Sequence, residues 1–227
     1  MKYKLPNNYL FALVSFTVAT LVILFIRNMI EGKTAYDLNF LLWNLFLAFL
    51  PLLFAWIIHF FAGKLNKVIV VIATLAWLLF YPNAPYMISD LIHVKNTSPV
   101  VLYDTLIIFL LAILALFYGF YSLKIIHFIY RNIAGLKVAN TVTWLSIILS
   151  GAGIYLGRIL RLNSWDIFHT PYKVLVMVVD HLFPVTKNPS TYALIFLFSI
   201  IQFIMLVMMK DLDEIESNRL ISGKYGR

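Results

Sequence analysis

The chain contains no cysteine and unusually few charged residues. Without cysteine, the protein has no disulfide bond, no thiol nucleophile and no thiolate metal site. Acidic and basic residues make up only 12% of the 227 residues, whereas roughly a quarter is usual for a soluble domain. We therefore expect the lipid bilayer to be the solvent for most of the chain.

The net charge of +8 is spread along the chain as single or paired lysines and arginines between apolar runs. Cations placed in this way are typical of membrane topology signals and of contacts with anionic headgroups. We expect membrane lipids as partners and no nucleic acid.

Six apolar runs predict membrane-spanning helices, since a helix needs about 20 residues to cross the hydrocarbon core. No run alternates with a period of two residues, which argues against strands of a β-barrel. The runs are Tyr9–Ile26, Phe40–Ala62, Val68–Tyr81, Val100–Leu123, Val138–Gly157 and Tyr192–Met209. The predicted fold class is all-α, a polytopic transmembrane bundle over residues 1–209 with a cytosolic tail over residues 210–227.

Two segments are too short to span the bilayer. Val68–Tyr81 has 14 residues, which rise about 21 Å against a core of about 30 Å. Pro82 and Pro85 then prevent the helix from continuing, and irregular backbone at this depth must be buried in protein or face a wet cavity. The second segment, Thr170–Phe183, has Pro171 at its start and predicts a short interfacial helix before the last span.

The distribution of cations predicts the orientation. If six spans alternate, eleven of the 18 lysines and arginines lie on the side of both termini. Because cytoplasmic loops carry an excess of cations, both termini are expected to be cytoplasmic. The polar clusters that follow the third and fifth runs then lie on the outer side.

Asp90-x-x-His93 and Asp166-x-x-His169 repeat one spacing on that outer side. Residues three apart share one face of a helix, so the four side chains are candidate ligands of a zinc or other divalent ion. Such a metal could activate water for hydrolysis, which makes the same four residues catalytic candidates. The alternative is that both aspartates pair with arginines while both histidines lie at the membrane interface.

Arg158 and Arg161 lie three residues apart at the outer end of the fifth run. Guanidinium groups bind phosphate and carboxylate through two parallel hydrogen bonds, which predicts an anionic lipid or lipid-linked substrate. The alternative is that both arginines extend to the headgroups or pair with Asp104 or Asp166. The candidate substrate-binding residues are Asn83, Tyr86, Asp104, Arg158, Arg161 and Asn163.

The fifth run also carries a stripe of small residues. Ser146, Ser150, Gly153 and Gly157 are spaced by four, three and four positions. Small residues at this spacing predict the close approach of a neighbouring helix.

These motifs resemble an uncharacterised bacterial membrane family, the domain of unknown function 1361. The resemblance is carried by the segments Tyr81-Pro82-Asn83-Ala84-Pro85-Tyr86, Ser89-Asp90-Leu91, Gly157-Arg158 with Arg161, and Asn163-Ser164-Trp165-Asp166. It extends from the second span to the last, although Ser89 stands where threonine is equally expected. The resemblance implies a bacterial inner membrane and brings no established reaction.

The favoured hypothesis is an outward-facing polar pocket used for hydrolysis or group transfer on an anionic lipid or lipid-linked envelope precursor. Arg158 and Arg161 would hold the anion, while Asp90 and His93 would act as metal ligands or acid–base groups. The alternatives are a small transporter or channel, and a non-catalytic membrane assembly protein. The sequence leaves enzymatic activity open.

Overall fold

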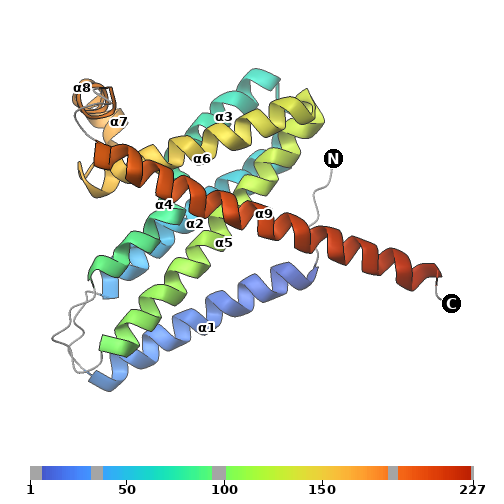
Figure 1. The fold of residues 1–227 in the computed structure, drawn as a ribbon, viewed down its shortest axis with the longest axis horizontal. Coiled ribbons are helices and arrows are strands. Elements are labelled where there is room, and N and C mark those ends of the chain that lie inside the picture. The colour runs from blue at the N-terminus through green and yellow to red at the C-terminus, as the bar shows by residue number, and fades with distance from the viewer. Residues whose placement is uncertain (1–6, 32–37, 94–100, 184–188, 226–227) are drawn as a thin grey trace.

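The computed structural model describes residues 7–31, 38–93, 101–183 and 189–225 (Figure 1). The α-helices are α1 (Asn7–Glu31), α2 (Leu38–Ala62), α3 (Lys67–Phe80), α4 (Asn83–Tyr86), α5 (Val101–Ala134), α6 (Leu136–Arg158), α7 (Asp166–His169), α8 (Pro171–Leu182) and α9 (Pro189–Tyr225), and η1 (Met87–His93) is a 3-10 helix. The described residues contain no strand, so the predicted all-α fold is confirmed.

The protein is a multi-pass membrane protein. Five helical segments are long and apolar enough to cross a bilayer, and α1 adds a shorter apolar stretch, Phe11–Arg27. The five segments are Phe40–Ala62, Lys67–Ile92, Val101–Ala134, Leu136–Arg158 and Pro189–Met208. These segments correspond to the predicted spans, and α8 occupies the position of the predicted short helix before the last one.

The predicted break in the third span is confirmed. α3 ends at Phe80, and the chain continues through Tyr81 and Pro82 into α4 and then η1. Ala84 and Pro85 are buried, and α4 contacts α2, α5 and α6. The irregular backbone is therefore shielded by protein, as its depth in the membrane requires.

α5 is the central helix of the bundle and contacts α1, α2, α4, η1, α6 and α9. The prediction that it ends at Leu123 was wrong, because the helix continues to Ala134. Ile125, Ile126 and Ile129 are buried and continue its apolar face. Lys124 does not interrupt the helix, since its ammonium group lies 5.5 Å from the centre of the Phe120 ring on the preceding turn.

At one end of the bundle, short turns join α2 to α3 and α5 to α6. Gly135 makes the second turn with φ 88°, a left-handed conformation that favours glycine. The His59 and Phe128 rings, 5.8 Å apart, join the ends of α2 and α5. The basic residues at these turns are Lys64, Lys67, Arg131 and Lys137.

The small-residue stripe of α6 packs as predicted, but with an additional member. Ser146 and Ser150 are buried, and Gly153 lies against Pro82 at the break after α3. The closest approach to a spanning helix is at Gly151, where an added Cβ would lie 2.6 Å from the carbonyl oxygen of Ile195 on α9. α6 therefore packs closely against the break on one side and α9 on the other.

Candidate functional site

Asp90 is a fully buried carboxylate that pairs with Arg158 at the end of α6. Arg158 Nη2 donates a hydrogen bond to Asp90 Oδ1 at 2.6 Å, and Asn44 Nδ2 donates to Asp90 Oδ2 at 3.0 Å. The Asp90 side chain is 0% exposed and that of Arg158 is 13% exposed. Both carboxylate oxygens thus have partners, and the buried charge is compensated, as a buried ion requires.

The Arg158 guanidinium is held on further sides by the segment that precedes Asp90. Its Nε donates to Ser89 Oγ at 2.8 Å, and Ser89 Oγ donates in turn to the Tyr86 carbonyl oxygen at 2.6 Å. The guanidinium carbon lies 4.5 Å from the centre of the Tyr86 ring, a cation–π arrangement. Arg158 therefore connects α6 to α4 and η1, and Ser89 acts as a hydrogen-bonding link.

Two glycines explain why the Pro-Asn-Ala-Pro segment fits between neighbouring helices. A Cβ added at Gly119 of α5 would lie 2.8 Å from Ala84 Cβ, and one added at Gly153 of α6 would lie 2.6 Å from Pro82 Cγ. Real Cβ atoms do not come this close to such rigid neighbours. The break after α3 is thus tightly packed between α5 and α6.

A groove of ≈ 750 Å³ lies between α2, α3, α4, α6 and α8. Its apolar walls include Leu78, Leu149, Leu156 and Val178. Five of the predicted substrate-binding residues line it, namely Asn83, Tyr86, Arg158, Arg161 and Asn163. The structure therefore brings these five side chains together around one amphipathic cavity.

Arg161 differs from Arg158 in conformation and in partners. Its φ is 55°, a left-handed conformation that costs a non-glycine residue about 1–2 kcal/mol. The turn is closed by the Leu162 amide, which donates to the Leu156 carbonyl oxygen at 3.1 Å. Arg161 is exposed, and it makes no hydrogen bond or ion pair with another described residue. It therefore adds an uncompensated positive charge to the groove.

The Asn-Ser-Trp-Asp segment closes the polar end of the groove. Asp166 Oδ2 accepts a hydrogen bond from the backbone N–H of Asn163 at 2.7 Å. Ser164 Oγ donates to the Leu79 carbonyl oxygen at 2.8 Å and accepts from Asn83 Nδ2 at 3.3 Å. Asp166 thus shapes a turn, and Ser164 attaches that turn to the end of α3.

The four predicted metal ligands have different surroundings. Asp90 pairs with Arg158, Asp166 accepts from Asn163, and His169 Nδ1 lies 3.1 Å from the Trp165 carbonyl oxygen. The side chain of His93 lies outside the described residues. Among the side chains that the structure describes, no three His, Asp or Glu residues gather at one point. The metal site stays a prediction, and three of its members already have other partners.

Asp104, the remaining predicted pocket residue, is not among the groove-lining residues. It is buried on α5 and accepts a hydrogen bond at Oδ1 from Arg27 Nε at 2.9 Å, and Arg27 Nη2 forms an ion pair with the same oxygen at 2.8 Å. This pair fastens α1 to α5, together with the hydrogen bond of 2.8 Å between the Thr17 and Tyr118 hydroxyls. Sequence reasoning missed Arg27 and Asn44 as partners of the two buried aspartates.

A protein family described as "Protein of unknown function (DUF1361)" has a family model that matches residues 43–205. The matched stretch contains Asn44, Asp90, Arg158 and Arg161, and it ends within α9. No curated protein and no solved structure matches the chain.

Proposed function

The chain belongs to the DUF1361 family, and from its own geometry we propose that it binds an anionic amphiphile, a lipid or lipid-linked molecule, in the groove. The observation that carries this proposal is Arg161. It lines the groove in a strained backbone conformation, and its charge has no partner among the described residues. Strain of this kind clusters at ligand-binding sites, and a guanidinium fork suits phosphate or carboxylate.

The remaining walls of the groove favour an occupant that also has an apolar part. Leu149 and Leu156 of α6 face Leu78 of α3 and Val178 of α8 across it. Along α6, the eight steps from Leu149 to Gly157 rise about 12 Å. This length is close to half of the ~30 Å hydrocarbon core. The groove thus has the depth of one leaflet and a cation at its polar end.

Binding is better supported than catalysis. The described residues that line the groove include no Asp, Glu or His, which are common general acids and bases. Asp90 lies behind Arg158 and is engaged on both oxygens. Hydrolysis or group transfer on the same ligand stays a prediction from the sequence.

Arg161→Ala is expected to weaken binding of an anionic lipid roughly tenfold to a hundredfold, since a charge-assisted hydrogen bond contributes about 1.5–3 kcal/mol. The measurement is a titration of phosphatidylglycerol into phosphatidylcholine nanodiscs, with bound lipid counted by native mass spectrometry. Arg131→Ala, an exposed arginine at the opposite end of the bundle, is the matched control and should leave binding unchanged. Equal binding by the wild type and Arg161→Ala would refute the proposal and favour a non-catalytic assembly protein.

We further propose that the groove opens on the outer side of a bacterial inner membrane. The two short turns at the opposite end carry Lys64, Lys67, Arg131 and Lys137, which supports a cytoplasmic location for that end.

Because the chain has no cysteine, single introduced thiols report this orientation. Cysteine at Lys173 on α8 should react with a membrane-impermeant maleimide on intact cells, whereas cysteine at Asn132 near the α5–α6 turn should react only after the cells are opened. The reverse pattern would place the groove on the cytoplasmic side.

A further inference from the structure

α8 is a groove wall whose apolar surface extends beyond the groove. Val174, Val178 and Leu182 are spaced by four residues, share one helix face and line the groove. On the adjoining face, Leu175 and Val179 are exposed, while Lys173 and Asp180 lie on the opposite side of the helix. An amphipathic helix of this kind lies in the membrane interface with its apolar surface toward the acyl chains.

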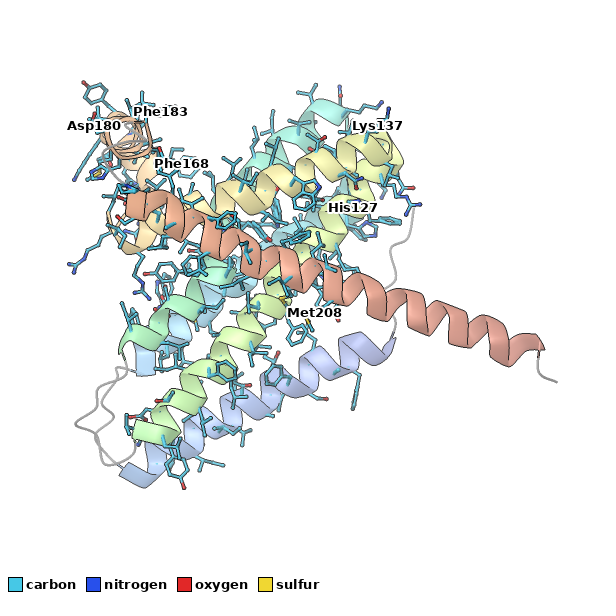
Figure 2. All side chains as sticks on the ribbon, viewed as in Figure 1. His127, Lys137, Phe168, Asp180, Phe183 and Met208 are labelled. Atoms are coloured by element: carbon cyan, nitrogen blue, oxygen red, sulfur yellow. The ribbon has the colours of Figure 1, made fainter. Side chains whose placement is uncertain are left out.

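The position of α8 agrees with a location at the membrane interface. Figure 1 shows α8 almost end-on while α2 and α5 lie across the view, so α8 runs across the direction of the spans. Figure 2 labels Phe168, Asp180 and Phe183 on this outlying part of the molecule, and Phe183 is 72% exposed. No residue of α8 is fully buried. α8 is thus a peripheral helix with little packing to hold it in place.

Few polar contacts attach α8, and they lie at its C-terminal end. Tyr155 Oη of α6 lies 3.3 Å from His181 Nδ1, and the Tyr192 hydroxyl of α9 donates to the Leu182 carbonyl oxygen. At the other end of α8, Val174 lines the same groove as Arg161.

Several apolar residues of the groove are also exposed to the outside. Ile92 is 70% exposed, and Leu149 and Ile167 are exposed as well. Leu149 belongs to a membrane-spanning helix, so we expect the medium that it faces to be the hydrocarbon of the adjoining leaflet. We therefore expect the groove to be open to lipid along one side.

We propose that the occupant is a lipid of the adjoining leaflet, which reaches the groove past α8 and places its chain between α6 and α8. Its anionic headgroup lies at Arg161, whose positive charge complements it. The small residue Ala152 leaves room for the chain between Leu149 and Leu156. This inference rests on the proposed function and specifies that the ligand comes from the membrane rather than from water.

A thiol on each face of α8 tests the inference in nanodiscs that contain phosphatidylglycerol. Pyrene maleimide attached to Val178→Cys should occupy the groove between α6 and α8. The same label attached to Val179→Cys should point away from the groove, toward lipid. We expect the first labelled protein to bind phosphatidylglycerol at least tenfold more weakly than its unlabelled form, and the second to bind as the wild type does. Ala152→Trp, which fills the groove without a label, should show the same loss.

The outcomes separate the two proposals. If both labelled proteins and Ala152→Trp bind phosphatidylglycerol like the wild type, the chain does not lie between α6 and α8, and the inference is overturned. If inorganic phosphate competes with phosphatidylglycerol at equal concentration, the apolar part of the ligand contributes nothing to binding, and both proposals are overturned. If the wild type does not prefer phosphatidylglycerol over phosphatidylcholine, the proposed function itself has failed.

Discussion

Arg158→Ala is expected to lower the free energy of unfolding by about 3–5 kcal/mol, because it leaves a buried carboxylate without its counter-ion. Asp90 is 0% exposed, and the neutral amide of Asn44 does not compensate its charge. The measurement is reversible unfolding in mixed micelles with increasing dodecyl sulfate, followed by tryptophan fluorescence. Arg131→Ala is the control, since an exposed arginine should change the unfolding free energy by no more than about 0.5 kcal/mol.

A double variant shows whether the effect comes from the unpaired charge. Asp90→Asn combined with Arg158→Gln removes both charges and keeps polar groups near Asn44 and Ser89. We expect the double variant to be more stable than Arg158→Ala, because no buried charge is left uncompensated. If Arg158→Ala unfolds like the wild type, or if the double variant is the less stable of the two, the ion pair does not hold η1 to α6.

Gly153→Ala is expected to destabilise the bundle by about 1–3 kcal/mol through overpacking. The added Cβ would lie 2.6 Å from Cγ and 2.9 Å from Cβ of Pro82. The proline ring cannot relieve this clash by adopting another rotamer. The same unfolding assay measures the effect.

Gly157→Ala is the matched control one turn later on the same helix. Its Cβ would lie 3.5 Å from Tyr86 Cε2, an ordinary contact, while alanine favours the helix by about 0.8–1 kcal/mol over glycine. Gly157→Ala should therefore be as stable as the wild type or more stable. Equal stability of the two variants would show that the break after α3 has room to move away from α6.

The sequence predicted the spans because most of them are long apolar runs, and predicted the break because Pro82 and Pro85 cannot continue a helix. The fourth apolar run ends at Leu123 because Lys124 follows it, whereas the helix α5 continues to Ala134. A lysine whose aliphatic part packs along its own helix does not end that helix, and the buried isoleucines beyond it extend the apolar face.

The members of the groove were partly predictable, because alternating spans bring Asn83, Arg158 and Arg161 to the same end of the bundle. Which charges pair was not predictable. The partner of Asp90 depends on how η1 and α6 turn toward each other, and Asn44 reaches the same carboxylate from a helix about 46 residues earlier in the chain. Helix rotation of this kind is set by packing, which apolar periodicity alone does not determine.

The spacing of Asp166 and His169 illustrates a second limit. Residues three apart share a face within a regular helix, but Asp166 begins the short helix α7, and its carboxylate turns back to the Asn163 amide. Carboxylates at helix starts commonly accept such hydrogen bonds. The spacing was therefore compatible with a local turn as well as with a metal ligand.

The most direct test of the groove as an anionic lipid site is a structure of the protein in nanodiscs that contain phosphatidylglycerol. The account predicts a phosphate within about 2.7–2.9 Å of the Arg161 guanidinium, with a chain running along α6 opposite α8. A groove filled only by protein side chains, with the lipid phosphates away from Arg161, would contradict it.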